Sequence, residues 1–197
     1  IQTSLDAEKV KLEAAGQELK AKTGLRNTAQ GNVEAKILEE TAAQTVVTDK
    51  TKIASDAQAA FVAADKAHND AVTEQVTAKK DADAVGKAIK AAKADLDVKT
   101  AAGVQADIDV AQKTFDDEKA KMNPAIELLN AKKQAALDAD GARAAAETAR
   151  NEAATAANDA QNALKAVKGE LANAQAAVTN AETDRVAAEN EHTRLDG

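Results

Sequence analysis

The fold of this chain is decided by its most alanine-rich stretch, residues 142–171, which read ARAAAETARNEAATAANDAQNALKAVKGEL. Alanine is the strongest helix former, and Glu, Lys, Gln and Leu follow it closely. Apolar residues recur here at alternating intervals of three and four. This spacing predicts one long helix with a seam of methyl groups along one side.

The predicted seam continues to residue 195. Its members are Ala142, Ala145, Ala149, Ala153, Ala156, Ala160, Ala163, Val167, Leu171, Ala174, Val178, Ala181, Ala188, His192 and Leu195, with Arg185 as the one charged residue on it. A buried methyl group contributes only about 0.8 kcal/mol. Stability therefore has to come from long helices that make many small contacts, which predicts a narrow bundle.

The same pattern predicts helices over 1–20, 53–98 and 104–122, the first with Ile1, Leu5 and Leu12 on one face. Breaks are expected at Gly24–Gly31, Thr45–Lys50, Thr100–Gly103, Asn123-Pro124 and Asp138–Gly141. At Asn123-Pro124 two interpretations stay open. Asn123 caps a new helix that begins with Pro124, or Pro124 kinks a helix that continues.

The predicted fold class is all-α, an elongated bundle of long antiparallel helices that forms a single domain over residues 1–197. Phe61 and Phe115 are the only aromatic residues, so a thick core is not expected. High charge with few aromatic residues is also typical of disorder, but the periodic apolar residues favour helices.

The charge pattern argues against nucleic-acid binding. The net charge is −7, and lysines alternate with acidic residues instead of forming a basic patch. The chain has no Cys and no apolar run near the roughly 20 residues of a membrane span. Because it begins with Ile1, we expect a processed or truncated form.

The two histidines, His68 and His192, are the only candidates for imidazole chemistry. A zinc site needs several converging Cys or His ligands. We therefore interpret both as seam or surface residues and predict no metal site.

Two acidic motifs, Asp81-x-Asp83 and Asp138-x-Asp140-Gly141, resemble the start of a calcium loop. Such a loop ends in a bidentate Glu at its twelfth position, where this sequence has Ala92 and Ala149. Two further acidic groups, Glu39-Glu40 and Asp116-Asp117-Glu118, are interpreted as solvated faces. Glycine-rich phosphate loops and nucleophile elbows are absent from the sequence. We predict a protein that is not an enzyme, with no catalytic, cofactor-binding or metal-ligating residues and no cofactor.

The alanine richness of stretches such as Ala142–Ala160, the lack of Cys and Trp, and the length resemble one family. The chain is similar to the glutamic acid/alanine-rich proteins of African trypanosomes, which are insect-stage surface proteins. The resemblance covers the whole chain in composition, length and helical pattern.

This resemblance implies a helical bundle similar to the core of the variant surface glycoproteins. It implies a glycoprotein ectodomain at the extracellular face of the plasma membrane, held by a glycosylphosphatidylinositol anchor after the C-terminal end. Asp196-Gly197 has the small residues that an anchor site needs. The implied function is a surface coat that shields the membrane, packs against neighbouring coat molecules and contacts a vector or host ligand.

Two other classes of function stay open. A coiled-coil spacer or scaffold would associate in parallel through the 142–195 seam. A surface receptor or adhesin would carry a ligand patch at one end of the bundle, built from the breaks at 24–31 and 99–104.

Overall fold

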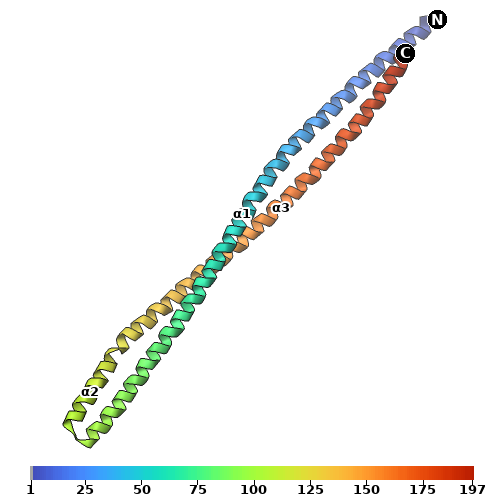
Figure 1. Ribbon diagram of the computed structural model, residues 1–197. Helices are drawn as coiled ribbons and strands as arrows, with labels where there is room; N and C mark the ends of the chain where they lie inside the picture. The colour runs from blue at the N-terminus through green and yellow to red at the C-terminus, as the bar shows by residue number, and fades with distance from the viewer. Residues whose placement is uncertain (1) are drawn as a thin grey trace. The chain divides into compact units, whose positions relative to one another are not determined.

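The computed structural model describes residues 2–197, with side chains from Leu5 onward, so Ile1 lies outside the described residues. The described chain forms three helices, α1 (Gln2–Ala102), α2 (Gln105–Ala120) and α3 (Met122–Asp196), of 101, 16 and 75 residues. The all-α prediction is confirmed for this part of the chain, which contains no strand. Long helices pair in antiparallel fashion, as expected (Figure 1).

The chain divides into two units, which we describe separately. Unit 1 comprises Ile1–Ala54 and Ala153–Gly197, and unit 2 comprises Ser55–Glu152. The predicted single domain stays a prediction.

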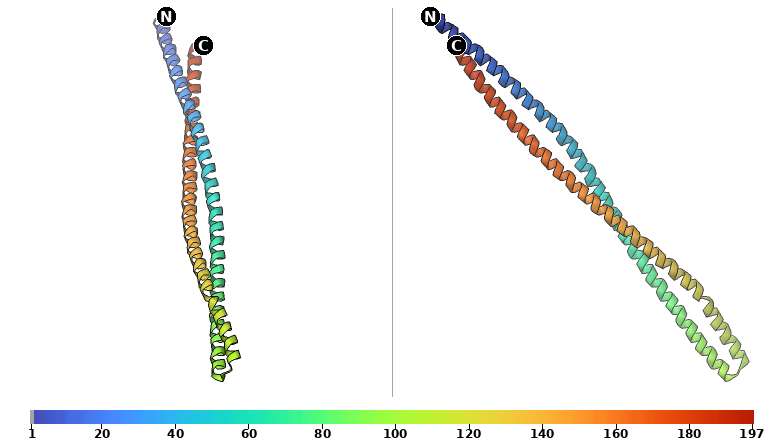
Figure 2. Two further views of the ribbon diagram at one scale, coloured as in Figure 1. Left: turned by 90° about the vertical axis from the view of Figure 1, so that its left-hand side faces the viewer. Right: turned by 180° about the vertical axis from the view of Figure 1, so that it is seen from behind.

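Unit 1 is an antiparallel pair formed by the N-terminal half of α1 and the C-terminal half of α3 (Figure 2). Lys22 Nζ lies 3.1 Å from Asp184 Oδ2, and Lys36 Nζ lies 2.8 Å from Glu170 Oε2. A step of fourteen residues along α1 is therefore matched by fourteen residues back along α3, so the two helices keep one register.

Unit 2 is a hairpin whose two sides keep a constant register as well. His68 lies beside Asp140, and Gly86 lies beside Met122. The spacing is eighteen residues on each side.

The turn of this hairpin was correctly predicted at Thr100–Gly103. α1 ends at Ala102, and Gly103 adopts a left-handed φ of 75°. The Gly103 N–H donates to the Lys99 and Thr100 carbonyls, which is the common glycine cap of a helix. Val104 then takes an extended conformation, and α2 begins at Gln105.

Neither alternative for Asn123-Pro124 is met, because the helix ends at Ala120 and a new one, α3, begins at Met122, before Asn123. Pro124 lies inside the first turn of α3, and α2 ends at Ala120, four residues before it. A proline ring clashes with the carbonyl of residue i−4, which is the carbonyl of Ala120. Only Lys121 interrupts the helix, with φ −75° and ψ −18°.

A single heptad seam runs along each side of the pairs. On α1 the seam begins at Leu12 and continues at alternating intervals of three and four residues to Lys99, and every residue in this series is buried or half-buried. The same holds from Ile108 through α2 and α3 to Leu195, so the break at Lys121 causes no slip. We use the usual heptad letters, in which a and d form the seam and e and g flank it on opposite sides.

Three predicted breaks are wrong, because these residues lie inside helices. The segment 24–31 stays helical since Arg26, Ala29 and Val33 keep the heptad, and a glycine costs only about 1 kcal/mol. At 45–50, the Thr45 and Thr48 hydroxyls donate to carbonyls four residues back, at 3.1 and 3.0 Å.

The predicted break at 138–141 is also part of α3. Gln134 donates to Asp138 at 2.8 Å, and Asp140 approaches both His68 and Arg143. The seam residues Ala139 and Arg143 continue the packing on either side of Gly141, so the helix does not end there.

The predicted seam is wrong by one residue over much of 142–163. Ala142, Ala145, Ala149 and Ala163 are exposed, whereas Arg143, Ala146, Arg150, Ala157 and Leu164 lie in the seam. Alanine occurs on several sides of this helix, so alanine alone does not mark the buried side. Arg185 is in the seam as predicted, but it is not the only charged residue there.

The core is made of small side chains. Ten of the residues whose side chains are described are buried, and all of these are Ala except Val33 and Leu164. The accessible surface of 13213 Å² is about 1.5 times the roughly 8,800 Å² of a compact protein of this mass. Long seam residues compensate in part, since the side chains of Lys36 and Arg185 are only 29% and 26% exposed and lay their aliphatic stems over the seam.

Candidate functional site

Unit 2 has an open groove of about 600 Å³ beside the seam. Val72, Ala136 and Leu137 supply its apolar surface. The polar side chains around it include His68, Gln75, Lys133 and Asp140. A groove of this volume lies within the range of ligand sites, but such sites bury most of the ligand, and this one is open to the surface.

A polar layer lies at the edge of the groove. His68 Nδ1 lies 3.7 Å from Asp140 Oδ1, which is also 3.8 Å from Arg143 Nε. Arg143 Nη1 reaches Asp65 Oδ1 at 3.4 Å. His68 Nδ1 and Arg143 Nε are buried atoms without a hydrogen-bond partner, whereas Arg143 Nη1 donates a hydrogen bond to Asp65 Oδ1.

The next seam layer of unit 2 contains an aromatic ring. The Arg150 guanidinium lies 4.3 Å from the centroid of the Phe61 ring, a cation–π contact worth about 0.5–2 kcal/mol. Arg150 and Arg143 are the seam residues that sequence reasoning missed. The heptad that begins at Ile108, followed strictly through Ala136, would have located them.

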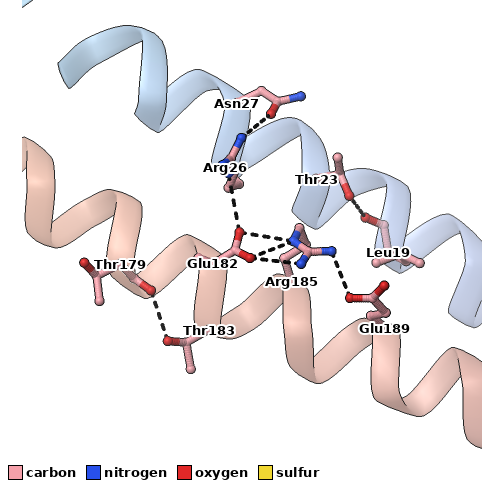
Figure 3. Close-up of polar contacts among 9 residues, drawn as sticks. All are labelled: Leu19, Thr23, Arg26, Asn27, Thr179, Glu182, Thr183, Arg185 and Glu189. Atoms are coloured by element: carbon pink, nitrogen blue, oxygen red, sulfur yellow. Dashed lines mark hydrogen bonds and ion pairs between the residues drawn. The ribbon is translucent and has the colours of Figure 1, made fainter. Parts of the chain in front are cut away.

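Unit 1 carries the densest ionic cluster (Figure 3). Arg185 donates to Glu182 at 2.9–3.2 Å and to Glu189 at 3.0 Å, and Arg26 of the facing helix lies 3.4 Å from Glu182. The hydrogen bond from Arg185 lowers the pKa of Glu182, and the same bond raises the pKa of Arg185. Both arginines occupy seam positions, so the cluster fixes the alignment of the two helices.

Two further ion pairs in unit 1 contain a residue whose pKa is shifted by hydrogen bonding. Hydrogen bonds from Lys36 to Glu170 and Glu39 raise the pKa of Lys36. The hydrogen bonds from Arg194 lower the pKa of Glu191. In both cases the hydrogen bond stabilises the charged form of the residue whose pKa is shifted.

His192 lies in the seam of unit 1, as predicted, with Gly16 facing it. A Cβ atom on Gly16 would stand 3.4 Å from His192 Nε2, so the imidazole packs closely against α1. Near this end an open depression of about 850 Å³ is lined largely by charged residues, including Glu8, Lys11 and Arg194.

The acidic motifs are distributed along the helix surfaces. Asp83 pairs with Lys79 at 3.2 Å, and Asp116 and Asp117 accept from Gln112 and Lys113. Asp138 accepts from Gln134 on its own helix. These contacts join residues four apart on one helix, and such exposed pairs contribute only about 0.3–0.5 kcal/mol.

The two glutamates of the Glu39-Glu40 motif have different partners. Glu39 pairs with Lys36 at 2.7 Å on its own helix, and Glu40 lies 3.8 Å from Lys168 of the facing helix. Asp196 is the last residue of α3, and Gly197 follows the helix.

The arrangement aligns and joins helices. Within the described residues, no group of three or more His, Asp or Glu side chains converges as metal ligands. None of the described helices combines the length and apolar character needed to cross a bilayer. The charged groups with shifted pKa values all pair with neighbouring side chains at the surface.

Comparison with protein-family models finds no match to the chain, and comparison with curated proteins finds none either.

Proposed function

We propose that this chain is a non-enzymatic structural protein of the cell surface, where it forms part of a coat. The observation that carries the structural role is the unbroken seam. In unit 1 it pairs residues 12–54 with residues 153–195, and in unit 2 it pairs residues 57–99 with residues 108–150, mostly through small side chains. In each unit, two helical segments about 70–80 Å long form a pair about 20 Å wide. Each pair therefore spans a long distance with a small cross-section.

Two features support the setting at a membrane surface. In unit 1, the start of α1 and the end of α3 lie side by side (Figures 1 and 2). A lipid anchor following Gly197 would therefore hold this end of unit 1 at the membrane. The resemblance in composition to trypanosome surface proteins supplies the anchor type and the neighbouring coat molecules as partners.

A coiled-coil spacer or scaffold is the second candidate function. The heptad that continues without a slip favours it, because a constant 3.5-residue period is the signature of a supercoiled pair. The folded-back pairing within each unit means that such a spacer uses both helices of one chain. It would then not need a parallel partner at 142–195.

A receptor or adhesin is the third candidate, supported by the groove of unit 2. The ligand patch expected at 24–31 is not supported, because these residues form regular helix. The polar groove around His68 and Asp140 is the alternative place for a ligand.

Mass spectrometry of the native C-terminus tests the coat proposal. The full-length protein is purified from the cells that make it and analysed before and after phosphatidylinositol-specific phospholipase C. A glycolipid near Gly197 that the lipase removes supports the coat. A plain polypeptide continuing past Gly197 without lipid overturns it, and the spacer becomes the leading function.

A further inference from the structure

The side of unit 2 that carries the groove exposes large apolar side chains. We call it the groove face and define it by Asp65, Val72, Val76 and Lys79 on α1 and Ile126, Lys133, Leu137 and Asp140 on α3. Its apolar members are exposed by 36% at Val72, 48% at Val76, 43% at Ile126 and 67% at Leu137. A pair of helices has no third element to cover these side chains.

The charged e positions of the groove face are segregated by sign, while Asp83, one turn from Lys79, pairs with it at 3.2 Å. Steps of seven residues from Asp65 along α1 lead to Val72, Lys79, Gly86 and Lys93. The same steps back from Glu147 lead to Asp140, Lys133, Ile126 and Lys119. These e positions are therefore acidic at the end near Asp65 and Asp140 and basic toward Lys79 and Lys133. In coiled coils, charges at the flanking positions select the partner and its direction.

This gradient is self-complementary for an antiparallel copy. Asp65 and Lys79 are both seven residues from Val72. A two-fold axis beside Val72 thus places Asp65 of one copy opposite Lys79 of the other. Lys133, which forms no ion pair within the described chain, is brought into the acidic field of the second copy. A parallel copy in register would place like charges opposite each other.

The same axis brings an apolar side chain at the border of the groove against its own copy. Because Asp140 lies beside His68, Leu137 is at nearly the level of Val72. Under the same two-fold axis, α3 of one copy faces α3 of the other, so the two Leu137 side chains meet beside the axis. Leu137, which is 67% exposed in the single chain, is thereby covered.

The available area suffices for a stable dimer. Two helices side by side present a face about 20 Å wide, and residues 59–87 extend over about 42 Å. This gives about 800 Å² for each partner, which is the standard size of a specific interface.

From these observations we propose that two copies of this chain associate antiparallel through their groove faces and form a four-helix bundle over unit 2. The Leu137 side chains hold it together. The attraction between Asp65 of one copy and Lys79 of the other sets its direction and acts beside the Asp65–Arg143 and Lys79–Asp83 pairs within each copy. This association goes beyond the proposed coat function and is independent of any lipid anchor.

Sedimentation equilibrium of the full chain, with Leu137→Gln and a matched control, tests the interface. Leu128→Gln is the control, because Leu128 is 48% exposed but borders a different, smaller groove with Thr73 and Thr77. We expect a concentration-dependent dimer whose Kd rises at least about tenfold in Leu137→Gln, since each dimer carries the substitution twice. Leu128→Gln should change the Kd by less than about twofold. Helix content by circular dichroism should match the wild type in both.

A second pair of variants tests the charges. Lys133→Glu should weaken the dimer, whereas Lys80→Glu, with the same charge change on the outward side of α1, should not. A chain that is monomeric at every concentration overturns the proposal. So does a dimer that is weakened more by Leu128→Gln or Lys80→Glu than by the variants of the groove face.

Cysteine cross-linking tests the direction, because the chain contains no Cys. Val72→Cys, beside the axis, should form a disulfide between copies. Lys93→Cys, far from the axis, should not. Cross-linking of Lys93→Cys as efficient as that of Val72→Cys would contradict the proposal, because the axis would then not lie beside Val72.

Discussion

Substitution of Gly141 tests whether α3 is continuous at residues 138–141, where the sequence predicts a turn and the structure has a helix. In the structure Gly141 lies inside α3, and a Cβ atom added to it meets nothing within 4 Å. Alanine is favoured over glycine inside a helix by about 0.8–1.0 kcal/mol. We therefore expect Gly141→Ala to stabilise the protein by about 1 kcal/mol, which raises the Tm by about 2–4 °C for a chain of this length.

Gly103 in the same unit is the matched control, because its Cβ also meets nothing within 4 Å but its φ is 75°. The left-handed conformation costs a residue with a side chain about 1–2 kcal/mol. Gly103→Ala should therefore lower the Tm, whereas Gly141→Ala should raise it.

The assay is thermal unfolding followed by far-ultraviolet circular dichroism, with both variants compared with the wild type at equal concentration. A fall in the Tm of Gly141→Ala, comparable with that of Gly103→Ala, would refute the continuous helix. It would restore the turn that Asp138–Gly141 suggests from sequence.

Two other substitutions probe the seam and its charges. Ala157→Asp places a charge at a position that is 8% exposed and should lower the free energy of unfolding, measured by denaturant titration, by at least about 2 kcal/mol. Ala163→Asp, on the exposed side, should change it by less than about 0.5 kcal/mol. Equal effects would contradict the corrected seam. The pKa of Glu182 in the folded protein is lower than the ordinary glutamate value of 4.5. As the pH falls below 4.5, this carboxylate is therefore protonated in the unfolded chain before it is protonated in the folded one. The contribution of Glu182 to stability is present above that pH and is lost below it. Glu182→Gln should flatten this part of the Tm–pH curve, and an unchanged curve would show that the Arg185 bond has no such effect.

The helical class could be predicted because it depends on composition and local preference. Alanine, lysine and glutamate favour a helix at nearly every position, and the left-handed cap at Gly103 follows a run of good helix formers. An interruption near Pro124 was also predictable, since proline removes a donor and crowds the carbonyl four residues back.

The false breaks show where local preference fails. Glycine at 24, 31 and 141 costs about 1 kcal/mol each, which the packing of neighbouring seam residues overcomes. That packing depends on a partner helix more than a hundred residues away in unit 1, and a local pattern does not contain it.

The predicted seam was wrong by one residue over much of 142–163 because alanine is not a marker of burial in this chain. Arg143 and Arg150 lie in the seam, where their charges reach Asp65 and the Phe61 ring. A search for apolar residues passes over them. The groove of unit 2 was missed for a related reason, since its lining combines two segments that only the antiparallel register brings together.

Chemical cross-linking across unit 1 tests the central claim, an antiparallel pair in one register, most directly. Lys36→Cys and Glu170→Cys are introduced together into the cysteine-free chain, because these side chains meet at 2.8 Å. The control joins Lys36→Cys with Glu191→Cys, which lies 21 residues, about 30 Å, farther along α3. With a short bismaleimide reagent at low protein concentration, the account predicts an efficient link within one chain for the first pair and none for the second. Links formed only between chains, or equal yields within the chain for both pairs, would contradict it.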